Sequence, residues 1–288
     1  MKKILITGTN SYIGNSFKIY IMKWGNEFEI ETIDVKQKEW KNIDFSKYDV
    51  LFHVAGIAHV KNGYKDEDLY YKINRDLSID IAKKAKAEGV RQFIFMSSIK
   101  VYGDKVLIDN NESIINKNTE PLPNNSYGKS KLQAEQGILI LQDYNFNVVI
   151  IRAPMIFGKG SKGNYPKLSK IAKLTPVFPD IYNQRSMLHI DNLCEFIRLI
   201  ILNNEKGIFF PQNKEYVCTS ELVKIIAAIS GKKIIFIRLF NPLIKLLRKK
   251  VNFINKIFGN FVYEKSMSEY KVEYRIRNLK ESIELTEK

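Results

Sequence analysis

Hydrophobic and polar positions along the first half of the chain follow two alternating periods. Short β-branched and aromatic runs have the length of buried strands, at residues 3–7, 28–35, 49–54, 92–96 and 147–151. The longer stretches between them repeat apolar positions at helical spacing, over residues 11–24, 69–88 and 127–142. This alternation predicts an α/β fold: right-handed β–α–β units that build a doubly wound parallel sheet with helices on both faces.

The pattern loosens after residue 152. Residues 104–125 are rich in Asn, Asp and Pro, and residues 158–163 read GKGSKG, so both stretches predict irregular loops. Helices are expected at residues 193–203 and 220–230. No linker or repeat divides the chain. We therefore expect one doubly wound domain over residues 1–155 and a smaller C-terminal lobe over residues 156–288, partly interleaved with the first.

Composition narrows the class of protein. A chain of 288 residues with 45% hydrophobic residues can bury a substantial core, which excludes disorder as its main state. Two cysteines, Cys194 and Cys218, are too few for a disulfide scaffold or a Cys-rich zinc module. His53, His59 and His189 have no partners at metal-ligand spacing, so no metal site is expected. The apolar run after Lys3 is too short for a signal peptide, and no stretch is long enough to cross a membrane. We expect a soluble, cytoplasmic protein.

The formal net charge of +15 suggests an anionic partner. Residues 232–277 hold twelve Lys or Arg against three acidic residues, with apolar residues interleaved over residues 236–258. This pattern is typical of a basic amphipathic helix, which either closes the C-terminal lobe, the interpretation we favour, or touches an anionic membrane peripherally. No nucleic-acid-binding module is evident, so a nucleic-acid partner is not expected.

A glycine turn follows the first predicted strand and opens the first predicted helix. In TGTNSYIG (residues 7–14), Gly8 permits a tight turn, and Gly14 lets the helix approach the sheet. The helix N-terminus then offers N–H groups to a pyrophosphate, as in a Rossmann-type dinucleotide site. Asp34, twenty residues after Gly14, can accept hydrogen bonds from the ribose and repel a 2′-phosphate. NAD is therefore the expected cofactor, and Lys36 and Lys38 leave NADP possible.

A serine, a tyrosine and a lysine form the candidate reactive group. Ser98 follows a predicted strand, and Tyr127 and Lys131 lie four residues apart on one face of a predicted helix. A tyrosine with an ordinary pKa of about 10 is a poor base at neutral pH, and lowering that pKa by about 3 requires about 4 kcal/mol. One ammonium about 4 Å away supplies a comparable amount at an effective dielectric near 20. We expect Ser98 to hold the substrate oxygen and Tyr127 to move the proton while a nicotinamide exchanges hydride.

In combination these motifs resemble the extended short-chain dehydrogenases/reductases of the NAD-dependent nucleotide-sugar epimerase/dehydratase family. The motifs that carry the resemblance are TGTNSYIG (7–14), LFHVAG (51–56), SSIKVYG (97–103), YGKSK (127–131), IRAPMIFGKG (151–160) and RSMLHIDN (185–192). The resemblance implies an enzyme with an NAD-binding domain over residues 1–155, a mainly substrate-binding lobe over residues 156–288, and a homodimer. It also implies catalytic roles for Ser98, Tyr127 and Lys131.

The resemblance further assigns residues to the two ligands. It implies that Asp44 lies near the adenine and Asn74 near the ribose, and that Arg185 clamps the diphosphate of the sugar nucleotide. Lys100, close to the predicted site in the sequence, is either a second substrate contact or a solvated lysine. The implied cofactor site comprises Gly8, Ser11, Tyr12, Ile13, Gly14, Asp34, Asp44, Ala55, Gly56, Asn74, Tyr127, Lys131 and Pro154.

Departures from the family pattern narrow the reaction. Ser11 replaces a third glycine, and Met155 stands where Asn is frequent. Dehydratases carry Asp-Glu after the catalytic hydroxyl, whereas Ile99 and Lys100 stand here, which argues against loss of water. We expect redox chemistry at sugar C4, foremost a UDP-sugar 4-epimerase in polysaccharide biosynthesis. Because SSIKV resembles reductases, the alternative is an NAD(P)H-dependent 4-ketoreductase of a UDP-4-keto-6-deoxy-(N-acetyl)hexose. A non-catalytic nucleotide-sensing member is the third hypothesis.

Overall fold

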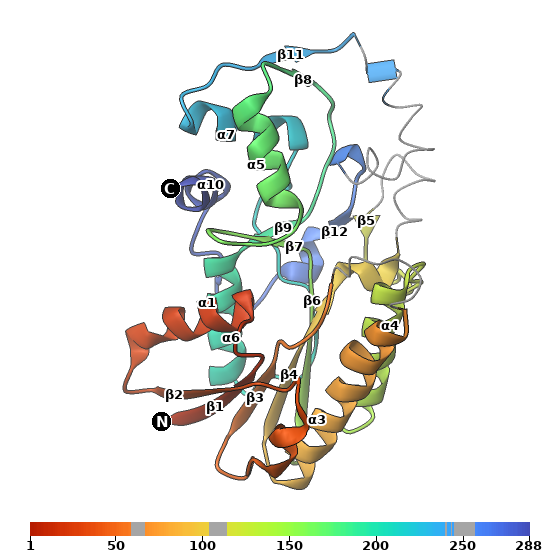
Figure 1. The fold of residues 1–288 in the computed structure, drawn as a ribbon, viewed down its shortest axis with the longest axis vertical. Helices are drawn as coiled ribbons and strands as arrows, with labels where there is room; N and C mark the ends of the chain where they lie inside the picture. The colour runs from red at the N-terminus through yellow and green to blue at the C-terminus, as the bar shows by residue number, and fades with distance from the viewer. Residues whose placement is uncertain (59–66, 104–113, 240, 243, 245–256) are drawn as a thin grey trace. The chain divides into compact units, whose positions relative to one another are not determined.

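A computed structural model describes residues 1–58, 67–103, 114–239, 241–242, 244 and 257–288, which form two compact units (Figure 1). The first unit comprises Met1–Gly103, Glu120–Ala153 and Leu193–Pro211; the second comprises Asp104–Thr119, Pro154–Asn192 and Gln212–Lys288. The sequence predicted domains over residues 1–155 and 156–288 that are partly interleaved; the two units of the structure interleave through residues 104–119 and residues 193–211. The latter segment returns because it adds an edge strand to the first sheet.

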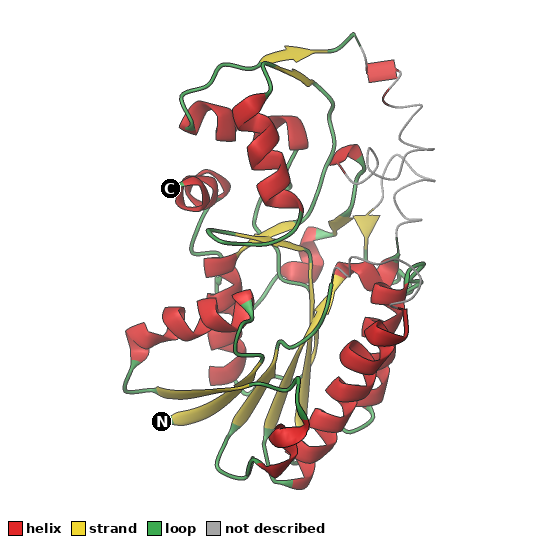
Figure 2. Cartoon of the chain, in the orientation of Figure 1, coloured by secondary structure: helices red, strands yellow, loops and turns green. Residues whose placement is uncertain are grey.

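The first unit is built on a six-stranded, fully parallel sheet (Figure 2). Its strand order is β10-β6-β4-β3-β1-β2. The strands are β1 (Lys2–Thr7), β2 (Phe28–Ile33), β3 (Val50–His53), β4 (Gln92–Ser98), β6 (Asn147–Ala153) and β10 (Gly207–Phe209). The prediction of a Rossmann-type doubly wound sheet is confirmed, and five of the strands fall on the expected apolar runs.

Helices cover both faces of this sheet, with α1 on one side and α3 and α4 on the other (Figure 1). Their bounds are α1 (Tyr12–Ile21), η1 (Met22–Trp24), η2 (Lys38–Asn42), α2 (Glu67–Tyr70), η4 (Tyr71–Asp76), α3 (Leu77–Ala87), η5 (Ile99–Tyr102), α4 (Ser126–Leu139) and α6 (Ile190–Leu202). The helix expected over residues 69–88 is thus interrupted: η4 is a π-helix between two α-helical parts. Such π-segments occur frequently at functional sites.

The core under α3 and α4 holds these helices in place. Leu51, Phe93 and Ile150 of the sheet pack against Ile81 of α3 and Ile138 of α4, and all five side chains are fully buried. Burying each such side chain stabilises the fold by about 1.5–3 kcal/mol. The site residues on α4 are therefore carried by a helix that is firmly seated on the sheet.

The second unit consists of short strand pairs and helices. Its parallel pairs are β5 (Ile114–Ile115) with β12 (Val262–Tyr263), β7 (Met155–Phe157) with β9 (Met187–His189), and β8 (Val177–Pro179) with β11 (Ile235–Ile237). Its helices are α5 (Asn164–Leu174), α7 (Thr219–Ile229), η7 (Lys265–Ser268) and α10 (Leu279–Glu287). The amphipathic helix expected over residues 236–258 lies largely outside the described residues. Among the described residues, no helix is long and apolar enough to cross a membrane.

Candidate active site

The turn between β1 and α1 has the geometry that a dinucleotide requires. Gly8 has φ +88°, and a Cβ atom there would lie 3.4 Å from Ala55. A Cβ on Gly14 would lie 3.0 Å from Ile6 Cγ2, so glycine lets α1 approach the sheet. Ser11, in place of the third glycine, caps α1 by accepting a hydrogen bond from Gly14 N at 3.2 Å. Tyr12 and Ile13 form the first turn, whose N–H groups suit an anion.

The two acidic residues expected at the adenosine end are both exposed. Asp34 directly follows β2, and its Oδ1 accepts a hydrogen bond from Lys36 N at 2.9 Å. Asp44 accepts one from Ser46 N at 2.9 Å, and hydrogen bonds from Ser46 lower its pKa. Both carboxylates are held in local turns. Asp34 lies at the carboxyl end of its strand, the edge at which parallel sheets bind nucleotides.

The segment after β3 meets the π-helix. Asn74 is fully buried; its Oδ1 accepts from Ile57 N at 2.9 Å, and its Nδ2 donates to Ile57 O at 2.9 Å and Ser130 Oγ at 3.2 Å. A Cβ on Gly56 would lie 3.0 Å from Asn74 Oδ1 and 3.3 Å from Lys131 Nζ. The hydrogen bonds of the Asn74 side chain therefore fix this turn. Asn74 itself lies on the π-helix, and the absence of a side chain at Gly56 leaves room for Lys131 Nζ.

The end of β4 and the start of α4 bring the serine and the tyrosine together. Asn125 caps α4 by accepting from Gly128 N at 2.9 Å. A Cβ on Gly128 would lie only 2.5 Å from Lys100 O, so the first turn of α4 rests directly on η5. Ser98 Oγ accepts from Lys100 N at 3.2 Å, and the Ser98 side chain also lies close enough to Tyr127 to affect the pKa of its phenol.

The pKa of Tyr127 departs from the expectation. Burial of the phenol raises its pKa above the usual value, while the interaction with the Ser98 side chain acts in the opposite direction. The sequence predicted that Lys131, with a bound nicotinamide, lowers this pKa. In the structure Lys131 Nζ donates to Met96 O at 2.9 Å, and burial of the phenol determines the direction of the shift. The ring of Tyr70 lies edge-on to that of Tyr127, with centroids 6.2 Å apart.

Lys131 is a buried cation at the centre of this site. Its side chain lies over the ring of Phe95, with Nζ 4.5 Å from the centroid. Burial lowers its pKa to about 8, and the negative charge of Glu135 opposes that shift. A lysine with such a pKa changes its charge close to physiological pH, which is a common property of functional sites.

Sequence reasoning missed a buried ionic group beside the lysine. Glu135 and Arg152 are 1% and 7% exposed, and Arg152 Nη2 donates to Glu135 Oε2 at 2.7 Å. Ser97 Oγ donates to the same carboxylate, and Arg152 Nη1 donates to Tyr102 Oη at 2.8 Å. One signal was present in the sequence: an arginine inside the apolar run NVVIIRA is almost never buried unless it is paired.

His53 is a buried histidine whose two ring nitrogens are both engaged in hydrogen bonds. His53 is stacked near Phe93 and Phe95, bonds Thr7 Oγ1 at 2.8 Å and Ser78 Oγ at 2.9 Å, and burial lowers its pKa to about 3. His59 lies outside the described residues. Within the part of the chain that is described, no group of His, Cys, Asp and Glu side chains could hold a metal ion.

Two predicted ligand contacts belong to the second unit. Pro154 follows β6 directly. Arg185 is tied to the backbone of its own unit: its N–H and C=O pair with Val217, and its Nη1 donates to Gly259 O at 3.1 Å. The roles of both residues toward cofactor and substrate stay predictions.

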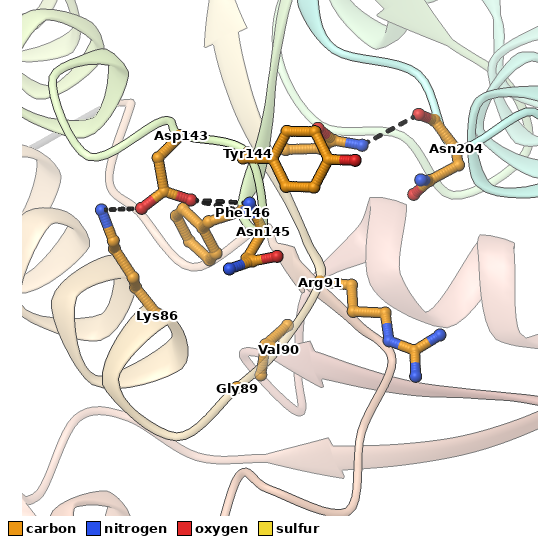
Figure 3. Close-up of a pocket in the computed structure, with 10 residues that line it drawn as sticks. Lys86, Gly89, Val90, Arg91, Asp143, Tyr144, Asn145, Phe146 and Asn204 are labelled. Carbon is orange, nitrogen blue, oxygen red and sulfur yellow. Dashed lines mark hydrogen bonds and ion pairs between the residues drawn. The ribbon is translucent and has the colours of Figure 1, made fainter.

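A hollow of about 500 Å³ lies at the opposite edge of the first sheet, where β4 and β6 begin (Figure 3). Lys86 donates to Asp143 Oδ2 at 2.6 Å, Tyr144 lies fully exposed beside it, and Asn147 Nδ2 donates to Asn204 O at 3.1 Å. Ligands of parallel sheets bind at the carboxyl ends of the strands, and these are the amino ends. The hollow is therefore separate from the candidate site.

Together, a parallel sheet with a glycine turn and a Ser98–Tyr127–Lys131 group at its carboxyl edge defines a Rossmann-type oxidoreductase-like enzyme. Residues 4–211 match the model of the NAD dependent epimerase/dehydratase family, and the chain belongs to this family. The prediction of a NAD-dependent enzyme of the nucleotide-sugar epimerase, dehydratase and reductase kind is thereby confirmed.

Curated relatives cover most of the chain. It is 29% identical over 249 residues to a UDP-glucose 4-epimerase of Vibrio cholerae, covering 78% of this chain and 75% of the relative. It is also 29% identical over 236 residues to the N-acetyl-alpha-D-glucosaminyl-diphospho-ditrans,octacis-undecaprenol 4-epimerase of Escherichia coli O157:H7, covering 78% and 68%.

Solved structures share the fold over nearly the full length. The UDP-glucuronic acid 4-epimerase from Bacillus cereus, in complex with NAD, matches with a TM-score of 0.75 at 17% identity, covering 99% of this chain and 97% of that one. A dTDP-4-dehydrorhamnose reductase from Clostridium acetobutylicum matches with a TM-score of 0.73 at 19% identity, covering 98% and 97%. At these identities the likeness concerns the fold.

Proposed function

We propose that this chain is a UDP-sugar 4-epimerase that inverts the configuration of the sugar at C4 with NAD held in the first unit. The observation that carries the proposal is the placement of Tyr127 against Ser98, with Lys131 beside the Gly56 turn. Two of the relatives that cover most of this chain are 4-epimerases by name.

Each residue of the site has a separate role in the proposed reaction. Bound NAD supplies a hydride acceptor that later returns the hydride. Ser98 holds the C4 oxygen by a hydrogen bond. Tyr127 takes the proton of the C4 hydroxyl and returns it after the keto sugar has rotated to present its other face. We assign to Lys131 the stabilisation of the Tyr127 phenolate as it forms, for which its ammonium turns from Met96 O toward the phenol oxygen. Since burial raises the pKa of Tyr127, this stabilisation is needed for proton removal at neutral pH.

The residues of the first unit favour NAD. The exposed carboxylate of Asp34 at the end of β2 accepts from ribose hydroxyls and repels a 2′-phosphate. Arg185 of the second unit is the residue we assign to the diphosphate of the substrate, since a guanidinium binds phosphate oxygens in a bidentate manner.

The position after Ser98 argues against a dehydratase and leaves one alternative. Ile99 is buried and Lys100 is a cation, so neither acts as the acid–base pair that loss of water requires. A 4-ketoreductase would use Ser98, Tyr127 and Lys131 in the same roles, with hydride delivered once from NAD(P)H. The run SSIKV favours this second candidate.

An NMR assay with UDP-hexoses separates the two. We expect UDP-glucose or UDP-N-acetylglucosamine to be converted to its C4 epimer without added reduced cofactor. Turnover only of a 4-keto-6-deoxy sugar nucleotide with NADH or NADPH would overturn the epimerase in favour of the reductase. Tyr127→Phe should lower either activity at least about a hundredfold while NAD still binds, and retained turnover would refute the assignment of the site.

A further inference from the structure

Three residues of α4 meet three consecutive residues of β4. Tyr127, Lys131 and Glu135 recur every four positions and so lie along one face of the helix. The Ser98 side chain interacts with that of Tyr127, Met96 O accepts from Lys131 Nζ at 2.9 Å, and Ser97 Oγ donates to Glu135. The third of these pairs continues the row of reactive residues by one helical turn.

The third pair is anchored from a neighbouring strand. Ser97 and Arg152 are cross-strand partners of β4 and β6, and Arg152 directs Nε and Nη2 to the two oxygens of the Glu135 carboxylate, at 2.7–3.2 Å. A buried ion pair of this kind adds little net stability over a well-packed apolar pair. Its presence under the reactive lysine therefore points to a role in positioning.

Glu135 follows Lys131 by one turn on the same face of α4, and among the described residues its carboxylate is the anion that favours the charged form of the lysine. From β3, His53 faces the lysine and is neutral, since burial and the lysine itself lower its pKa to about 3. From β4, the Phe95 ring and Met96 O face it. From the π-helix and α4 come the neutral groups Asn74, Ser130 and Tyr127. Among the residues that the structure describes, the further charge beside Glu135 is that of Arg152, which is bound to it.

We propose that Glu135, clamped by Arg152 and Ser97, is a positioning residue that keeps the ammonium of Lys131 charged and in place between Met96 and the Gly56 turn. This inference rests on the proposed function only where it concerns catalysis. Its direct consequence is a property of the folded protein: the proton affinity of Lys131 depends on the charge of Glu135.

The test is the titration of Lys131, followed by NMR of the intact protein labelled with ¹³Cε-lysine, the signal being assigned by its loss in Lys131→Met. Glu135→Gln keeps the shape of the side chain and removes the charge, so the midpoint should fall by about one pH unit. Glu135→Asp should restore it at least in part. Glu195→Gln, which alters a separate Glu–Arg pair on α6, is the matched control and should leave it unchanged.

An unchanged Lys131 midpoint in folded Glu135→Gln would overturn the proposal. If the unpaired Arg152 prevents folding, the neutral pair Glu135→Gln/Arg152→Met replaces the single variant. It should lower the midpoint by a smaller amount, because Glu135 is the nearer charge, and an unchanged midpoint there is equally decisive.

A kinetic measurement separates this inference from the proposed function. The alkaline limb of the pH profile of kcat should move with the NMR midpoint, about one pH unit lower in Glu135→Gln. If no sugar nucleotide is turned over, the proposed function fails while the NMR result still decides the inference. An NMR shift without a kinetic shift would overturn the catalytic part of the proposal.

Discussion

Replacing Lys131 by methionine should make the protein more stable while it removes activity. The pKa of Lys131 is lowered from 10.5 to about 8, chiefly by burial. Between these two values the unfolded chain binds more protons than the folded one, so this lysine makes stability rise with pH in that window. The penalty of charging the buried lysine is fully present below pH 8 and disappears as the pH rises through 10.5.

The magnitude follows from the linkage relation. At pH 7 the penalty is about 3 kcal/mol, and at pH 9.5 it is about 1 kcal/mol. Lys131→Met loses the hydrogen bond to Met96 O, a net loss of about 1 kcal/mol, so the observed gain at pH 7 is about 2 kcal/mol. The most reliable quantity is the difference between the two pH values, in which pH-independent packing changes cancel: the gain should be about 2 kcal/mol larger at pH 7 than at pH 9.5.

Urea unfolding at both pH values measures this quantity directly. Lys129→Met is the matched control, because Lys129 lies on the same helix but is exposed, and its effect should be small at both pH values. A gain for Lys131→Met that is the same at pH 7 and pH 9.5 would show that burial does not depress the proton affinity of this lysine, and the electrostatic account of the site would be wrong.

Three further predictions concern the scaffold and the cofactor. Gly128→Ala places a Cβ 2.5 Å from Lys100 O and should cost about 1–3 kcal/mol of unfolding free energy, whereas Gly25→Ala, with its nearest contact at 3.6 Å, should cost little by the same urea assay. Burial lowers the pKa of His53 to about 3. Below pH 6.5 this residue is therefore protonated in the unfolded chain and neutral in the folded one, so the free energy of unfolding falls by about 1.4 kcal/mol for each pH unit of acidification. His53→Gln should flatten that slope between pH 6.5 and 4.5, and an unaltered slope would refute the assignment. In fluorescence titrations, Asp34→Ser should change the ratio of the Kd for NAD to the Kd for NADP at least about tenfold in favour of NADP. An unchanged ratio would show that Asp34 does not determine the choice of cofactor.

Local patterns in the sequence were sufficient for the elements that carry the site. The apolar runs and glycine spacing predicted five of the six sheet strands and the turn at Gly8 and Gly14. These features depend on neighbouring residues: strand and helix periods and a positive φ are set within one turn of the chain. The sequence also placed Tyr127 and Lys131 on one face of a single helix, where the structure has them, while the catalytic roles of Ser98, Tyr127 and Lys131 stay predictions.

The electrostatics of the group were decided by tertiary packing. The sequence led us to expect Lys131 to lower the pKa of Tyr127, but its ammonium is directed to Met96 O and burial raises that pKa. Likewise Glu135 and Arg152 are 17 residues apart and meet only because α4 packs on β4 and β6. Charge interactions depend on distance and on exclusion of water, and both are properties of the folded chain, so the residues were readable from the sequence while their protonation was not.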